Sequence, residues 1–410
     1  MYNYHADIIW VVNGVLLCVV VLTCLVILLT VVINNHIWER RRRGLLNIKK
    51  DVYEFALTHR GSSSSVCPLP VNDITPQQFI DIKTNRRIDS AFFNDSEQQL
   101  LKDCLIRPEE LAKLEDTALR SGNKWRKIEA MLCLGYIQVR SAVDILKKTI
   151  LSKDSDVSHF SIVALGQIKT AHAARILLDF LKKSPSSGYK IVSILKAFPE
   201  DIIDDVFKLT DYHDTIVRYW ALTLLSGFKL HGYTRRLEKL TEDMSAEIRA
   251  AACVCLGNAT GAEAKSTLIR CLKDDSWLVR SKAILSLSKI AGDPALPEIT
   301  VLINDPSWVV VDAVKVAMAD HIVASLPYIE KFLSGDYEVA KKYSVLALQD
   351  SGYMDKLLKE AVSGKNNAIR LLRSVIKSKF HSGLDAALSY LDPAAREKAI
   401  EVLMKTEGLE

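Results

Sequence analysis

The sequence contains few glycine, proline and aromatic residues for its length. Among 410 residues there are 17 glycines and 11 prolines, and aromatic residues make up 7%. Loop-rich β-sandwiches and barrels use more of these residues, so their scarcity argues against such folds and favours helices. Hydrophobic residues make up 49% and charged residues 25%, close to the average for folded domains, which excludes a wholly disordered chain.

The spacings that catalytic and metal sites need are also missing. The 8 cysteines are scattered and fit neither a disulfide framework nor a zinc site. Cys253 and Cys255 are two positions apart on a predicted helix, so their side chains would point in different directions. The 9 histidines form no paired-ligand motif, and no phosphate-binding glycine loop occurs. We therefore expect no enzyme activity, no catalytic residues, no metal ligands and no cofactor.

A long apolar run lies near the start of the chain. Residues 8–34 carry no charge and are dominated by valine, leucine and isoleucine. A helix of this length spans the roughly 30 Å hydrocarbon core of a bilayer. Trp10 and Trp38 flank the run, as aromatic residues do at membrane interfaces. The preceding residues 1–7 lack the lysine or arginine of a cleaved signal peptide. The run therefore predicts one transmembrane helix.

Positive charge is concentrated directly after this run. Residues 39–60 contain seven lysines and arginines and three acids, whereas the whole chain has a net charge of +5. The positive-inside rule then places the N-terminus outside and the rest in the cytoplasm, with the chain in the inner (plasma) membrane. Basic side chains next to a bilayer also bind anionic lipid head groups. This basic patch consists of Arg40, Arg41, Arg42, Arg43, Lys49 and Lys50.

Composition also divides the chain into segments. The run from Gly61 to Ser65 and the prolines at 68 and 70 break all periodicity and indicate a linker. The predicted segments are an extracytoplasmic tail over 1–7, the transmembrane helix over 8–34, a basic amphipathic juxtamembrane segment over 35–60, a Ser/Pro linker over 61–76, N-terminal capping helices over 77–116 and helical repeats over 117–410.

The C-terminal part repeats itself every 30 or 31 residues. Eight apolar residues recur at this period, and most have a second apolar residue eight positions earlier, such as Val217 and Ile248. Each period holds two amphipathic helices that cannot bury their apolar faces alone but can do so in a stack. The recurring residues, called anchors below, are Leu134, Leu165, Leu195, Leu225, Leu256, Leu287, Met318 and Leu348.

The stretch from Cys271 to Leu287, CLKDDSWLVRSKAILSL, resembles a HEAT repeat. Its short period is similar to the variant found in phycobilisome-lyase-type proteins. The resemblance implies an all-α fold, a right-handed α-solenoid of about nine to ten helical hairpins. It also implies a ladder between neighbouring repeats, built from an aspartate in the turn and an arginine in the second helix. Asp243 with Arg249 and Asp274 with Arg280 fit this ladder, whereas Val311 stands where the arginine after Asp305 should be, so we expect the ladder to lapse there.

Two classes of function remain open. One is a membrane-tethered cytoplasmic scaffold or adaptor that binds membrane-associated protein partners, by analogy within an envelope or polysaccharide assembly complex. The other is a small-ligand sensor or lyase-like accessory protein that uses the groove of the repeat array. The repeats are nearly neutral overall, so we expect no nucleic-acid partner. A clustered basic groove would favour a nucleic-acid partner. A deep polar pocket would favour a small ligand, and a shallow apolar surface would favour a scaffold.

One surface stands out in the repeats. Trp277 and Trp308 are one period apart, and Tyr337 falls close to the next equivalent position. All three come directly before a predicted second helix, where other repeats have small or polar residues. Rings in such a row either cover the preceding turn or anchor a partner protein. We take these three residues as the candidate partner-binding site.

The topology can be tested with protease. Protease added to intact spheroplasts should leave the chain after residue 61 uncut, because the arginine run keeps it on the cytoplasmic side. Lysed spheroplasts provide the control in which the same chain is cut. Digestion of the repeats in intact spheroplasts would contradict the predicted orientation.

Overall fold

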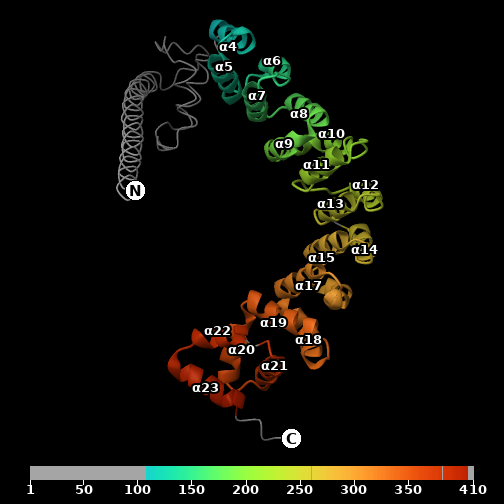
Figure 1. Cartoon of the computed structure of the whole chain (residues 1–410), viewed down its shortest axis with the longest axis vertical. Helices are drawn as coiled ribbons and strands as arrows, with labels where there is room; N and C mark the ends of the chain where they lie inside the picture. The colour runs from blue at the N-terminus through green and yellow to red at the C-terminus, as the bar shows by residue number, and fades with distance from the viewer. Residues whose placement is uncertain (1–107, 260, 381, 405–410) are drawn as a thin grey trace, which may run out of the picture. The chain divides into compact units, whose positions relative to one another are not determined.

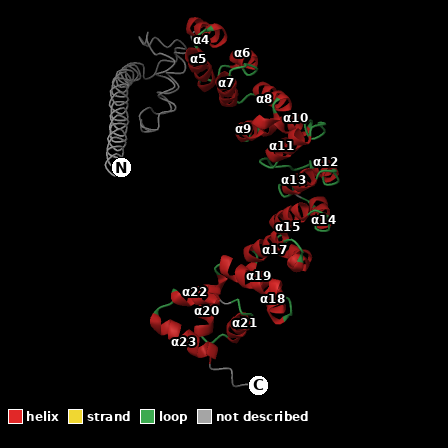
Figure 2. Ribbon diagram, viewed as in Figure 1, coloured by secondary structure: helices red, strands yellow, loops and turns green. Residues whose placement is uncertain are grey.

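The computed structural model describes residues 108–404 except 260 and 381. Within this range the chain folds into helices and connecting turns, with no strand (Figures 1 and 2). The predicted transmembrane helix, basic patch, linker and most of the capping segment lie outside the described residues. Between residues 108 and 404, no helix is both long and apolar enough to cross a membrane.

The helices pair into ten successive hairpins, each with a first and a second helix. The expectation of an all-helical repeat array is therefore confirmed, whereas its handedness stays a prediction. The first hairpin begins at Pro108, so the expected boundary between residues 116 and 117 falls inside its first helix, α4 (Pro108–Arg120). The chain divides into two compact units between Leu177 and Leu178, within α8 (Ala171–Lys183).

The helix bounds follow the repeat period. The first unit holds α4, α5 (Lys124–Tyr136), α6 (Val143–Thr149), α7 (Ser155–Ile168) and the start of α8. The second unit holds α9 (Gly188–Leu195), α10 (Ile203–Phe207), α11 (Thr215–Leu225), α12 (Thr234–Leu240), α13 (Ala246–Leu256), α14 (Ala262–Cys271), α15 (Trp277–Ala291), α16 (Leu296–Thr300), α17 (Trp308–Asp320), α18 (Ile322–Ser334), α19 (Glu338–Asp350), α20 (Tyr353–Val362), α21 (Asn366–Lys377), α22 (Ser382–Ser389) and α23 (Pro393–Met404).

Several second helices start where a polar side chain caps them. Asn123 accepts hydrogen bonds from the backbone of residues 125 and 126 at the start of α5, and Asp154 does the same at the start of α7. At α11, Asp214 accepts from the backbone N–H of Ile216. Such caps satisfy amide groups that have no partner within the helix. The polar residue before α5, α7 and α11 thus fixes where each of these three helices begins.

Second helices form the spine of each unit. In the first unit α5 packs on α7, and in the second unit α9, α11, α13, α15, α17 and α19 pack on one another in that order (Figure 1). First helices cover one side of this spine. All eight anchors are fully buried, with no exposed surface. Since about 25 cal/mol is gained for each Å² of apolar surface buried, each hairpin depends on its neighbours for stability.

The packing order changes after α19. There α20 packs on α19, and α21 packs on α18, so the first helix of this hairpin contacts the preceding second helix. The helices α22 and α23 then pack against α20. This change comes directly after Leu348, the last anchor that the sequence period identifies. The period therefore ends where the order of packing changes.

A glycine explains one irregular stretch of sequence. Residues 184–188 break the repeat pattern, and in the structure they form a short 3₁₀ turn that leads into α9 at Gly188. A Cβ atom at Gly188 would lie 2.2 Å from Nε1 and 2.3 Å from Cδ1 of Trp220 on α11. The missing side chain lets the indole ring of Trp220 lie against the backbone of α9.

Replacing Gly188 tests this close approach. Gly188→Ala should lower the free energy of unfolding by about 1–3 kcal/mol, because the new methyl group forces the indole ring or α9 to move. Gly335→Ala is the matched control in the same unit, since a Cβ there would make only ordinary contacts of 3.5 Å. Thermal unfolding followed by circular dichroism compares the two. Equal melting temperatures would show that α9 and α11 do not need this glycine.

Candidate functional site: an exposed aromatic row beside an arginine–aspartate ladder

The three predicted partner-binding residues all lie at the amino-terminal ends of second helices. Trp277 is the first residue of α15, Trp308 is the first residue of α17, and Tyr337 is the N-cap of α19. Their exposed fractions are 47%, 72% and 68%. The equivalent positions in the two preceding repeats are Thr215 and Ala246, which are the first residues of α11 and α13. We call Trp277, Trp308 and Tyr337 the aromatic row.

The exposure of the aromatic row separates its two interpretations. A ring that covers a turn as a hydrophobic cap would be largely buried against it. Trp308 and Tyr337 instead leave more than two thirds of their surface open, and Trp277 leaves about half. One further apolar side chain, Met244, lies in the turn before α13 and is 99% exposed. No sequence pattern indicates Met244, because a single methionine in a turn does not recur at the repeat period.

A polar turn holds the start of each of these helices. The carboxylate of Asp274 accepts a hydrogen bond from the backbone N–H of Ser276 at 2.8 Å, and Asp305 accepts one from Ser307 at 2.9 Å. Both serines have the extended backbone of an N-cap residue, directly before the tryptophan. The aspartates therefore fix the turns from which Trp277 and Trp308 project.

Each of these aspartates also binds an arginine of the preceding repeat. Arg249 donates from Nε and from a terminal nitrogen to the two carboxylate oxygens of Asp274, both at 2.8 Å. Arg280 binds Asp305 in the same two-point manner at 2.8 Å. This planar, bidentate geometry is the strongest form of hydrogen bond between charged side chains. The ladder therefore joins successive repeats.

Each arginine uses its remaining nitrogen on its own turn. Arg249 donates to the carbonyl oxygens of Asp243 and Met244 at 2.9 and 3.2 Å. Arg280 donates to those of Asp274 and Asp275 at 2.8 and 3.0 Å. One guanidinium thus connects the turn before its own helix to the turn of the next repeat. Because the turns at Asp274 and Asp305 carry Trp277 and Trp308, the ladder sets the spacing of the two tryptophans.

The ladder is longer than the sequence suggests. Arg218 of α11 lies 3.3 Å from Asp243, which adds a rung at the start. The expected lapse at Asp305 is wrong in one respect, since Asp305 accepts from Arg280 and its side chain is only 5% exposed. The ladder ends one step later, because Val311 offers no guanidinium to the following turn. A spacing of 25 residues between arginine and aspartate is the signal that identifies all three rungs.

At the central rung of the ladder, formed by Arg249 and Asp274, each side chain stabilises the charged form of the other. The hydrogen bonds from Arg249 lower the pKa of Asp274 below its ordinary value, and the same contact raises the pKa of Arg249. Arg280 likewise has a raised pKa because it is hydrogen-bonded to Asp305. Arg249 and Asp274 expose only 18% and 14% of their side chains, so solvent weakens this pair little.

The side of the spine away from the first helices contains a hollow. It has a volume of about 390 Å³ and lies along α11, α13 and α15. Apolar side chains dominate its lining, with Glu247 and Lys282 as the charged residues. Leu278, the neighbour of Trp277, is one of the lining residues. This apolar surface therefore begins next to the aromatic row.

The other residues considered from the sequence take no part in these surfaces. Cys253 and Cys255 are both buried, and Cys253 contacts Cys271 of α14 rather than Cys255. Burial raises the pKa of the Cys255 thiol. Within the described range, no group of three or more histidine, cysteine or acidic side chains could hold a metal ion. The six residues of the basic patch lie outside the described residues.

Comparison with known proteins supports the repeat assignment. The family model described as HEAT repeats matches residues 111–197 and 233–319, so the chain carries HEAT repeats there. No curated protein matches the chain. The resemblance to the phycobilisome-lyase-type variant stays a prediction.

Several solved structures are similar to this chain at low identity. An engineered protein is 15% identical over 80% of this chain and 98% of its own, with a TM-score of 0.34. Human deoxyhypusine hydroxylase in complex with glycerol is 17% identical over 60% of this chain and 96% of its own, with a TM-score of 0.26. The karyopherin Kap121p bound to RanGTP is 16% identical over 89% of this chain, which spans 52% of Kap121p, with a TM-score of 0.45. These similarities carry no conclusion about function.

Removing the central carboxylate tests the ladder. Asp274→Asn should lower the free energy of unfolding by about 2–3 kcal/mol at neutral pH, because a half-buried guanidinium loses its anionic partner. Since the folded pKa of Asp274 is lowered, its stabilisation is present above the unfolded pKa and is lost as the pH falls through the folded value. The difference from the unmodified chain should therefore shrink in acid.

Glu242→Gln is the control for this experiment, because it removes a negative charge from the exposed neighbour of Asp243. This control should change the free energy of unfolding by less than about 0.5 kcal/mol. Urea unfolding at neutral and acidic pH measures both variants. The structural role of the ladder would be contradicted if Asp274→Asn lowered the free energy of unfolding no more than Glu242→Gln does, or if its effect did not change with pH.

Proposed function

We propose that this chain is a protein-binding scaffold whose aromatic row captures a partner protein. The observation that carries the proposal is the exposure of Trp277 and Trp308 at equivalent positions of successive repeats, with Tyr337 one position before the equivalent residue of the next repeat. Tryptophan and tyrosine supply large contact areas at a small entropy cost and are enriched among residues that dominate binding energies. Exposed rings in a row are costly in water unless a partner covers them.

The geometry of the row supports binding of a folded partner or a long segment. Adjacent packed helices lie about 8–10 Å apart, so three successive repeats place the rings over roughly 20 Å. The ladder holds the turns that carry the two tryptophans, so little order is lost when a partner binds. A rigid, repeated set of anchors of this kind suits a protein surface better than a single small molecule.

The sequence adds a location to this proposal. In this proposal, the apolar run over residues 8–34 anchors the chain in the inner (plasma) membrane, and the basic patch binds anionic lipid head groups. The repeats then lie at the cytoplasmic face and meet membrane-associated partners at a raised effective concentration. A place in an envelope or polysaccharide assembly complex is the specific form of the proposal, and it rests on analogy alone.

Changing both tryptophans tests the aromatic row. The full-length chain carrying Trp277→Ser and Trp308→Ser should lose its co-purifying partner protein after detergent extraction. Its free energy of unfolding should change by about 1 kcal/mol or less, because exposed rings contribute little to the fold. Affinity purification with mass spectrometry measures the first effect, and thermal unfolding measures the second.

Two controls make the result decisive. Tyr189→Ser with Tyr390→Ser removes two rings that are 77% and 86% exposed elsewhere, and this variant should keep the partner. Ala251→Phe partly fills the apolar hollow and should also keep it. If the tryptophan variant loses several degrees of melting temperature yet still binds, the rings are structural. If only Ala251→Phe loses the bound molecule, the hollow is the site and a small-ligand function is supported.

A further inference from the structure

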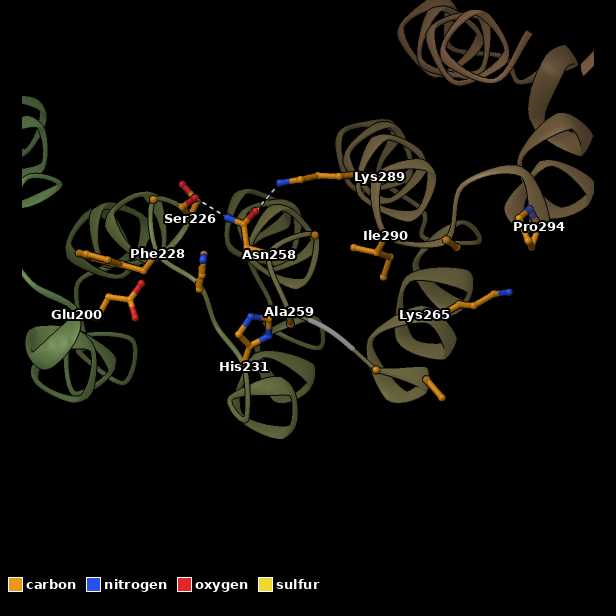
Figure 3. A pocket seen from close by; sticks show the side chains of 16 residues that line it. Glu200, Ser226, Phe228, His231, Asn258, Ala259, Lys265, Lys289, Ile290 and Pro294 are labelled. Carbon is orange, nitrogen blue, oxygen red and sulfur yellow. Dashed lines mark hydrogen bonds between the residues drawn. The ribbon is translucent and has the colours of Figure 1, made fainter. Parts of the chain in front are cut away.

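A second hollow lies at the other ends of the second helices. It has a volume of about 930 Å³ and is lined by the segments that follow α11 and α13 and by the end of α15, together with the start of α14 (Figure 3). We call it the basic groove, and its charged or titratable lining residues are Glu200, Lys229, His231, Lys265 and Lys289. Glu200 and Lys265 lie toward opposite ends of it, with His231 and Lys289 between them (Figure 3). The aromatic row is at the amino-terminal ends of α15, α17 and α19, and α15 is the one helix that both surfaces share, at its opposite ends, so the two surfaces are separate.

The groove collects positive charge from two repeats. Lys229 follows α11, Lys265 lies in α14, and Lys289 lies in the last turn of α15. No ion pair with a described residue neutralises Lys229 or Lys265. Lys289 donates only to a neutral group, the side-chain carbonyl of Asn258 at 2.5 Å. Three like charges therefore face one hollow with a single carboxylate among them.

Two arginines on the flanking helices, unlike the groove lysines, are paired with carboxylates. Arg236 of α12 lies 3.0 Å from Asp204, and Arg270 of α14 lies 2.8 Å from Glu238. The ladder arginines are also paired with carboxylates. This region of the chain thus supplies acids to its arginines but not to the lysines of the groove. The unneutralised charge is what a negatively charged ligand would complement.

The shape of the groove fits an extended chain. Gly227, Asn258 and Lys289 occupy equivalent positions in three successive repeats, and all three line the groove. Two steps of about 8–10 Å give a length of roughly 20 Å. An extended peptide rises about 3.3 Å per residue, so about six residues would fit. Gly261 also lines the groove, and nothing lies within 4 Å of the position that a Cβ atom would take there, which leaves room for a peptide backbone.

We propose that the basic groove binds an extended acidic peptide segment of about six residues, rich in aspartate and glutamate, from a partner protein. Nucleic acid also carries negative charge, but sites for single strands combine a basic groove with exposed aromatic platforms for the bases. The aromatic side chain that lines this groove, Phe228, is only 6% exposed. The lining therefore favours carboxylates over stacked bases. The basic groove is a different surface from the aromatic row, and the two binding proposals do not depend on each other.

A labelled hexaglutamate peptide tests the proposal by fluorescence anisotropy. The full-length chain is used with Arg40–Arg43 changed to glutamine, because that run would itself attract an acidic peptide. Lys229→Gln, Lys265→Gln and Lys289→Gln together should weaken binding at least about tenfold, since each lysine contributes an ion pair of modest strength. Glutamine at position 289 can still donate to Asn258. Added salt should weaken binding of the unmodified groove.

The control removes the same charge elsewhere. Lys331→Gln, Lys359→Gln and Lys377→Gln change three exposed lysines outside the groove and should alter the affinity less than twofold. Changing the three groove lysines to glutamate should reverse the preference, so that hexalysine binds in place of hexaglutamate. Melting temperatures confirm that every variant is folded.

Three results would overturn the proposal. One is an equal loss of affinity in the control and groove variants, which would mean that the peptide responds to net charge alone. Another is hexaglutamate binding that survives the change of all three groove lysines. The last is a thymidine oligonucleotide of equal charge that binds more tightly than hexaglutamate through the same lysines, which would assign the groove to nucleic acid. None of these results would bear on the aromatic row, because its residues are unchanged in every variant.

Discussion

Burial of each second helix between its two neighbours is the constraint on which the rest of the structure depends. A single hairpin has apolar faces that it cannot cover, so the eight anchors become buried only when hairpins stack. Stacking at a fixed period places equivalent residues of successive repeats next to one another. Any residue type that recurs at this period therefore becomes a row on the surface, without further cost to the fold.

Both candidate surfaces arise from this geometry at opposite ends of second helices, the aromatic row on α15, α17 and α19 and the basic groove on α11, α13 and α15. At the amino-terminal ends, aspartates shape the turns, arginines connect them to the next repeat, and the aromatic row projects from them. At the carboxyl-terminal ends, Asn258 joins the carbonyl of Ser226 to the ammonium group of Lys289, which links three repeats across the basic groove (Figure 3). The first end is apolar and exposed, and the second is basic and hollow. The two ends therefore suit partners of different chemistry.

Much of the fold follows from the sequence, because period and apolar pattern are local properties of a repeat. The anchors and the start of the second helices at Trp277 and Trp308 could be predicted from spacing. The spacing also indicated an arginine–aspartate ladder, but not that Arg218 adds a rung or that Asp305 accepts from Arg280. The close contact of Gly188 with Trp220 could not, since it depends on how two helices approach each other in space. The basic groove was missed for the same reason. Lys229 and Lys265 are unremarkable in sequence and become neighbours of Lys289 only when the repeats stack.

The central claim is that the aromatic row contacts a partner protein, and photo-crosslinking tests it most directly. A benzophenone amino acid placed at Trp308 in the full-length chain should, in living cells, form one discrete adduct with another protein. The additional change Trp277→Ser should abolish that adduct, because the rings bind as a row. The same photoreactive residue at Tyr390, which is 86% exposed, should form no such adduct. Adducts of equal yield from positions 308 and 390, or none from 308, would contradict the account.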